Sequence, residues 1–114
     1  MAEFANPFQG NCDRKLSKEE LIQALRIDIA AELEAMYLYE AHAMATDDVL
    51  VKKVLEDIRD EEKEHAGELL ALMRYLDPSA AELLYEGHGE VREMMEKLKM
   101  DSETIEKATG PIGK

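Results

Sequence analysis

The chain is poor in the residues that form disulfides, tight turns and large aromatic cores. It has one cysteine, six glycines, three prolines and no tryptophan in 114 residues. A single thiol, Cys12, allows neither an intrachain disulfide nor a cysteine-based metal cluster, which is typical of a reducing compartment. No run of about 20 apolar residues is present, which excludes a membrane-spanning helix. The N-terminus lacks a basic region followed by an apolar stretch, so we expect no secretory signal and a cytoplasmic protein.

Positive charge is scarce as well. Fourteen lysines and arginines stand against 26 aspartates and glutamates, giving a formal net charge of −12. Because phosphate would be repelled, nucleic acid is excluded as a partner, whereas cations are attracted to an acidic surface. The abundant residues are Ala, Leu, Glu, Lys and Met, which favour helices. Together with the length, this composition predicts one small all-α domain.

Two long amphipathic helices are predicted in the first two thirds of the chain. A Ser17-x-x-Glu20 capping box predicts the start of the first, whose apolar period continues to about Ala45. A break at 46–48 separates it from the second, which continues to about Leu76. Because the connection is short, we expect the two helices to form an antiparallel hairpin.

The rest of the chain predicts shorter helices. Asp77-Pro78 should end the second helix, and we expect a short helix at 79–86, a break at 87–89 (Gly-His-Gly) and a helix at 90–100. Asp101-Ser102 predicts the cap of a last helical turn. The domain organisation predicted from these signals is a flexible N-terminal arm (1–16), a helical domain (17–100) and a short helix with a tail (101–114). No function is predicted for the arm, Cys12 or His88.

Three ligand-type residues lie where apolar side chains are expected. Glu62 and His65 are one helical turn apart and leave the same face of the second helix, inside its apolar stripe. Glu32 lies inside the apolar stripe of the first helix. At about 1.5 Å per residue, Glu32 and Glu62 are nearly level in an antiparallel hairpin. An unpaired buried carboxylate costs several kcal/mol, so we interpret the three as metal ligands. A solvated groove, or glutamates satisfied by lysine, is the alternative.

One glutamate and one Glu-x-x-His pair make only half of a carboxylate-bridged di-iron site, which takes two such sets. Two hairpins related by a two-fold axis would form a four-helix bundle holding both halves. The ligands then suffice for two metal ions. Oxygen-rich ligation with one imidazole per metal suits Fe or Mn better than a tetrahedral structural zinc site.

These segments resemble the encapsulated ferritin family. The resemblance covers roughly residues 17–100 and is carried by Glu32-Leu33-Glu34-Ala35, by Tyr39 and by the run Arg59-Asp60-Glu61-Glu62-Lys63-Glu64-His65-Ala66. It implies a two-helix hairpin with short C-terminal helices that completes a ferritin-like four-helix bundle by dimerisation. It further implies a ferroxidase centre formed between two chains and a ring assembled from such dimers. The ring would function inside an encapsulin nanocompartment, with the shell protein as partner.

The resemblance also implies roles for single residues. Glu32, Glu62 and His65 would hold two iron ions per dimer, with Mn or Zn as substitutes and Glu62 as the bridging carboxylate. Tyr39 would lie beside the site, and Glu34 would attract incoming metal. The predicted function is oxidation of Fe²⁺ to Fe³⁺ with O₂ or peroxide, for iron storage or detoxification. The alternatives are a rubrerythrin-like peroxide scavenger, a non-catalytic metal-dependent oligomer or metal buffer, and a plain helical interaction module.

Overall fold

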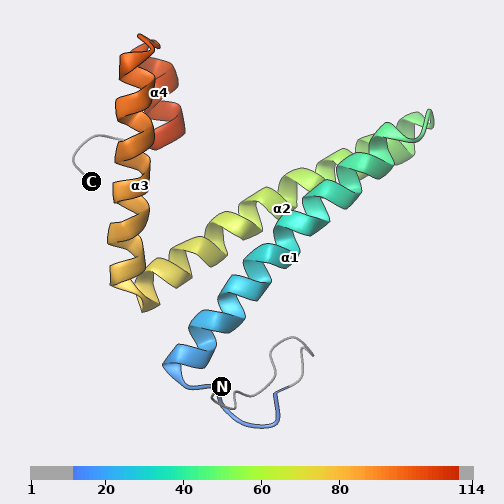
Figure 1. Ribbon diagram of the computed structural model, residues 1–114. Coiled ribbons are helices and arrows are strands. Elements are labelled where there is room, and N and C mark those ends of the chain that lie inside the picture. Colours follow the sequence, from blue (N-terminus) through green and yellow to red (C-terminus); the bar gives the residue numbers. More distant parts are fainter. Residues whose placement is uncertain (1–11, 111–114) are drawn as a thin grey trace. The chain divides into compact units, whose positions relative to one another are not determined.

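The structure, a computed structural model, describes residues 12–110. They form four helices: α1 (Lys18–Met44), α2 (Val49–Leu76), α3 (Pro78–Lys97) and α4 (Ser102–Thr109) (Figure 1). No strand occurs between residues 12 and 110, so the all-α prediction is confirmed. None of the helices found there is both long and apolar enough to span a membrane. Most of the predicted arm (1–11) and the end of the tail (111–114) lie outside the described residues.

The chain divides into two compact units, Met1–Leu76 and Asp77–Lys114. In the first unit α1 and α2 lie side by side as an antiparallel pair, as predicted (Figure 1). Between them, the Thr46 hydroxyl accepts a hydrogen bond from the Asp48 amide (3.2 Å), and the Asp48 carboxylate accepts one from the Val51 amide (3.0 Å). Asp48 therefore satisfies an amide at the start of α2 that has no helical partner.

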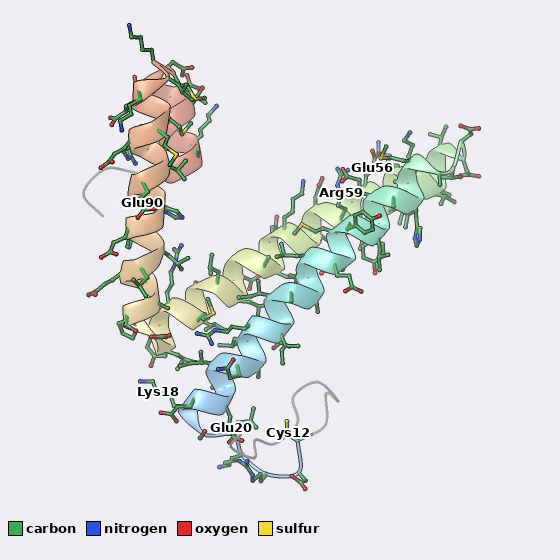
Figure 2. All side chains as sticks on the ribbon, viewed as in Figure 1. Cys12, Lys18, Glu20, Glu56, Arg59 and Glu90 are labelled. Atoms are coloured by element: carbon green, nitrogen blue, oxygen red, sulfur yellow. The ribbon has the colours of Figure 1, made fainter. Side chains whose placement is uncertain are left out.

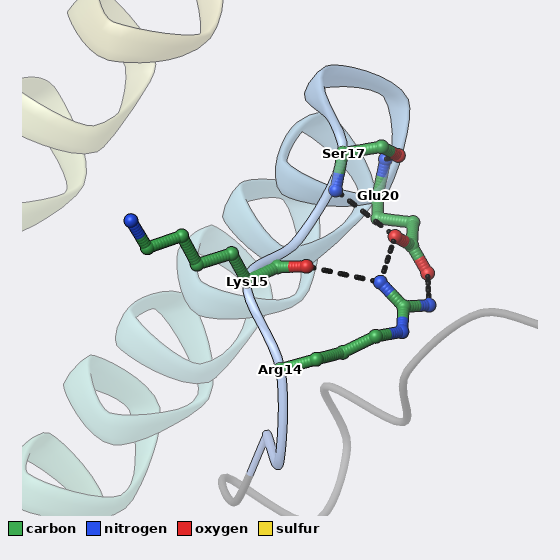
Figure 3. A network of polar contacts seen from close by, with 4 residues as sticks. All are labelled: Arg14, Lys15, Ser17 and Glu20. Carbon is green, nitrogen blue, oxygen red and sulfur yellow. Dashed lines mark hydrogen bonds and ion pairs between the residues drawn. The ribbon is translucent and has the colours of Figure 1, made fainter.

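The predicted capping box at the start of α1 is confirmed. The Ser17 hydroxyl accepts a hydrogen bond from the Glu20 amide (3.2 Å), and the Glu20 carboxylate accepts one from the Ser17 amide (3.0 Å). Glu20 is 4% exposed, and its charge is balanced by the Arg14 guanidinium, which donates to both carboxylate oxygens at 2.8 and 2.6 Å (Figure 3). Arg14 also donates to the Lys15 carbonyl (3.0 Å). This network ties the segment that precedes α1 to its first turn.

The hairpin buries few side chains. Ala24, Leu25 and Ala43 are buried on α1, whereas no residue of α2 is fully buried. Arg59, labelled on α2 in Figure 2, donates to the Glu40 carboxylate of α1 at 3.3 Å. Large apolar side chains remain exposed on both helices: Leu21, Leu33, Tyr37, Leu38, Met44, Val49, Leu50, Val51, Val54, Leu72 and Tyr75. Since a stable helix hides its apolar stripe, these exposed residues show that the hairpin alone covers the apolar stripes of α1 and α2 only in part.

The predicted break at Gly87-His88-Gly89 is wrong. Helix α3 is continuous through these residues and ends at Lys97. A glycine in a helix interior costs about 1 kcal/mol relative to alanine, but it does not stop the helix unless φ becomes positive. Positive φ angles among the described residues occur only at Lys99 and Gly110, both beyond the end of α3. The two glycines therefore lower the helix propensity of this segment without ending α3.

Aspartate side chains cap the starts of both α3 and α4. Pro78 is in the first turn of α3, and Asp77 accepts a hydrogen bond from the Ala80 amide at 3.3 Å. Asp101 accepts one from the Thr104 amide at 2.9 Å, which confirms the predicted cap of α4 and lowers the pKa of the Asp101 carboxyl. Gly110, at φ 79°, ends α4 in the left-handed region that favours glycine.

A substitution at Gly89 should stabilise α3. A Cβ built on this residue meets nothing within 4 Å, so Gly89→Ala removes a helix-weakening residue without a clash. The expected gain in the free energy of unfolding is about 1 kcal/mol. Urea denaturation followed by circular dichroism at the helix wavelength measures it. A loss of stability would mean that the backbone at Gly89 is not helical.

Candidate metal centre

The structure brings Glu32, Glu62 and His65 together. Each offers one ligand atom, and these atoms all lie within 4.8 Å of one another. The Nδ1 atom of His65 is 3.5 Å from Oε2 of Glu62 and 3.7 Å from Oε2 of Glu32. No further His, Cys, Asp or Glu joins this group in the part of the chain that the structure describes.

Two features of the sequence position these side chains. The three-residue spacing of Glu62 and His65 places both on one face of α2. The antiparallel hairpin brings Glu32 of α1 to the level of that pair, because the residue counts from the connection are similar and both helices rise about 1.5 Å per residue. The site is therefore built on two packed helices, which hold its ligands more firmly than loops would.

The carboxylates are largely withdrawn from water, whereas the imidazole is open. The side chains of Glu32, Glu62 and His65 are 24%, 17% and 49% exposed. Oε2 of Glu32 is buried and accepts no hydrogen bond. A carboxylate oxygen that is shielded from water and accepts no hydrogen bond raises the free energy of the folded chain. A bound cation or a protonated imidazole would offset this cost. Hard oxygen donors beside one imidazole fit an iron or manganese ion.

His65 opens onto the uncovered apolar surface of α2. On this helix Val54, His65 and Leu72 fall within about 20° of one another, at 100° per residue. Val54 and Leu72 are 47% and 50% exposed, close to the value for His65. The ligand group is thus not enclosed by its own hairpin. The spacings of eleven residues (Val54 to His65) and seven residues (His65 to Leu72) carry this signal in the sequence, although the helical period by itself predicts Val54 and Leu72 as core.

The other two predicted site residues are not part of the group. Glu34 is exposed, and two residues after Glu32 it points about 200° around the helix. Tyr39 is half-buried and lies seven residues after Glu32, which is about 10 Å along the axis of α1. A contact of either residue with the metal ligands therefore stays a prediction.

Comparisons with known proteins agree with the predicted resemblance. The model of a family described as EncFtn-like matches residues 12–87. A ferritin-like–encapsulin shell fusion protein of Pyrococcus furiosus is 45% identical over 89 residues, which are 78% of this chain and 26% of that protein. The encapsulin nanocompartment cargo protein EncC of Myxococcus xanthus is 43% identical over 76 residues, 67% of this chain and 58% of that protein. The chain therefore spans less than two thirds of either relative.

A solved structure resembles the chain as well. The crystal structure of the encapsulated ferritin domain from Pyrococcus furiosus superposes with a TM-score of 0.70 at 45% identity. The match covers 77% of this chain and 90% of that domain. It confirms the prediction of a ferritin-like helical fold.

Proposed function

The chain belongs to the EncFtn-like family, and from that membership we propose that it is a ferroxidase, which oxidises Fe²⁺ to Fe³⁺ at a di-iron centre shared by two chains. The proposal rests on one observation. Glu32, Glu62 and His65 offer ligand atoms within 4.8 Å of one another, and one carboxylate oxygen among them is buried without a hydrogen bond.

The second chain is needed because one chain supplies too few ligands. Three residues cannot fill the coordination of two iron ions, whereas a two-fold axis over the open side of His65 doubles the set to four carboxylates and two imidazoles. Within this set Glu62, the least exposed of the three, is the bridging carboxylate. The exposed Val54 and Leu72 beside His65 support the same arrangement, because a second hairpin there would cover them.

The residues of the chain favour the oxidised ion. Bound iron supplies the electrons, which pass to O₂ or peroxide. Anionic carboxylates stabilise Fe³⁺ more than Fe²⁺, since the attraction grows with the charge of the ion. His65 fixes the direction from which each ion is held. The limited exposure of Glu32 and Glu62 strengthens these interactions because water screens them less.

Two further residues take the roles that the family resemblance gives them. Tyr39 lies near the completed centre and donates its hydroxyl to a ligand. Glu34 is exposed, and there it attracts incoming cations. Manganese or zinc would occupy the same ligands without iron oxidation.

The relatives support an encapsulin partner. One contains an encapsulin shell in the same polypeptide, and another is named as cargo of an encapsulin nanocompartment. We infer that this chain works in the cytoplasm inside such a shell, as a ring of dimers that stores or detoxifies iron.

Anaerobic titration with Fe²⁺, followed by admission of air, tests the proposal. The expected result is binding of about one iron per chain, then rapid growth of Fe³⁺ absorbance on exposure to air. Binding without oxidation would instead favour a metal buffer or a metal-dependent oligomer. Oxidation with peroxide but not with O₂ would favour a rubrerythrin-like scavenger, and absence of binding would leave a plain helical module.

A further inference from the structure

Arg59 forms a polar link between the two helices of the hairpin (Figure 2). Its Nη1 atom donates to Oε1 of Glu40 on α1 at 3.3 Å, and its Nε atom donates to Oδ1 of Asp60 at 3.1 Å. The Arg59 side chain is 20% exposed, whereas Glu40 and Asp60 are 56% and 60% exposed. The hydrogen bond from Arg59 also lowers the pKa of the Asp60 carboxyl. The guanidinium is therefore held by one carboxylate from each helix.

This link lies at the same register as the ligand group. Along α1, Glu40 follows Glu32 by eight residues, or about 12 Å. Along α2, Arg59 precedes His65 by six residues, or about 9 Å. Because the helices are antiparallel, both displacements point toward the connection, and they differ by only about 3 Å. The bond between Arg59 and Glu40 therefore belongs to the same alignment of α1 against α2 as the ligand group does.

Apolar packing by itself specifies this alignment weakly. The buried apolar residues of α1 are Ala24, Leu25 and Ala43, and no residue of α2 is fully buried. A slip of α1 by one helical turn, about 5.4 Å, presents the same face to α2 again. The ligand atoms lie within 4.8 Å of one another, so such a slip would separate Glu32 from the two ligands of α2. A polar contact can distinguish one register from the next where apolar packing does not.

In the observed register Arg59 meets a carboxylate of α1, and in a slipped register it would not. The residues of α1 one turn away from Glu40, on either side, are all uncharged: Met36, Tyr37, Ala43 and Met44. A slip by one turn would leave the guanidinium facing apolar or aromatic side chains of α1. Because hydrogen bonds between charged groups are stronger than those between neutral ones, the Arg59 bond favours the observed register.

We propose that Arg59 is a positioning residue: its bond to Glu40 fixes the register of α1 against α2 and so keeps Glu32 level with the two ligands of α2. The inference rests on the proposed metal centre, because it concerns the alignment of that centre's ligands. Arg59 lies about 120° from His65 around α2. It is therefore away from the open side of the centre, where the second chain is proposed.

The shape of the arginine side chain suits this role. Its Nε atom serves the carboxylate on its own helix and its Nη1 atom serves the carboxylate across the hairpin, so that Asp60 directs the guanidinium toward Glu40. The donors of a guanidinium keep a fixed geometry, whereas a lysine ammonium is a single point charge on a flexible stem. Arg59→Lys should therefore keep the positive charge and lose the alignment.

Anaerobic titration of the full chain with Co²⁺ tests the role of Arg59, because the visible absorption of bound Co²⁺ reports its ligand geometry. We expect Arg59→Gln, Arg59→Lys and Glu40→Gln each to weaken Co²⁺ binding by about 10- to 100-fold, the range typical of residues that orient a metal ligand. The absorption spectrum of bound Co²⁺ should also move toward that of Glu32→Ala, since Glu32 is the ligand that loses its alignment.

Charge and folding alone predict different results. Loss of the positive charge of Arg59 would by itself strengthen the binding of a cation, so a weaker affinity in Arg59→Gln is not an effect of charge. Lys63→Gln is the matched control. It removes the same charge from a side chain that is 60% exposed and lies 3.5 Å from Asp60 of its own helix, and it should bind Co²⁺ at least as tightly as the wild type. Partial unfolding would lower the apparent affinity only by the folded fraction, which circular dichroism measures.

The outcomes separate this inference from the proposed function. The double variant Arg59→Gln/Glu40→Gln should bind Co²⁺ no more weakly than the weaker single variant, because the two residues act as one link. Wild-type affinity and spectrum in Arg59→Gln would overturn the positioning role and leave the metal centre in place. Identical Co²⁺ binding by the wild type and Glu32→Ala would overturn the metal centre and this inference together. A wild type that binds Co²⁺ but does not oxidise Fe²⁺ would contradict the ferroxidase proposal alone.

Discussion

Iron oxidation is expected to fall by about 100-fold or more in Glu62→Ala. Residues that only orient a metal ligand change affinity or activity by about 10- to 100-fold, and removal of the ligand should exceed that range. Glu62 is the least exposed of the three ligand residues and lies 3.5 Å from His65. In the proposed shared centre Glu62 would be the bridging carboxylate of each chain, so one substitution would remove two bridging carboxylates per dimer.

The measurement is the initial rate of Fe³⁺ absorbance after addition of Fe²⁺ in air, together with the iron bound per chain. Glu61→Ala is the matched control: it removes the same charge from the neighbouring position, where the side chain is exposed and outside the ligand group. Glu32→Ala and His65→Ala should lose oxidation as well. A Glu62→Ala protein that oxidises iron at the rate of Glu61→Ala would show that the centre lies elsewhere.

The helix starts and the pairing of α1 with α2 were predictable because neighbouring residues in the sequence determine them. Ser17 and Glu20 form the predicted capping box, the connection after α1 keeps α1 and α2 antiparallel, and Asp101 caps α4. Glu32, Glu62 and His65 were found because carboxylates are out of place in an apolar stripe. In each case a few neighbouring residues, or a helical period, determine the structure by themselves.

The features that the sequence did not predict depend on the three-dimensional surroundings of a residue. Two glycines at 87 and 89 predict a break in the helix, yet both residues are helical and neither has a positive φ. Sequence periodicity also did not distinguish an apolar side chain that packs within the hairpin from one such as Val54, which stays exposed.

A substitution at Glu32 should separate stability from metal binding. In Glu32→Leu the buried oxygen that accepts no hydrogen bond is replaced by an apolar group. A buried polar atom without a hydrogen-bond partner costs about 1–3 kcal/mol, and the substitution removes this cost. We therefore expect the metal-free protein to resist urea better than the wild type by an amount in this range.

Metal should then narrow or reverse the difference in the free energy of unfolding between the two proteins. Fe²⁺ added under anaerobic conditions at 100 times its dissociation constant stabilises the wild type by about 2.7 kcal/mol, because it binds the folded protein alone. Glu32→Leu has lost one ligand of each set and should gain little from the same addition. Urea denaturation with and without Fe²⁺ measures both effects, and Glu34→Leu, at an exposed position two residues away, is the control. If Glu32→Leu instead destabilised the metal-free protein and Fe²⁺ still stabilised it fully, Glu32 would be a structural partner of His65 and not a metal ligand.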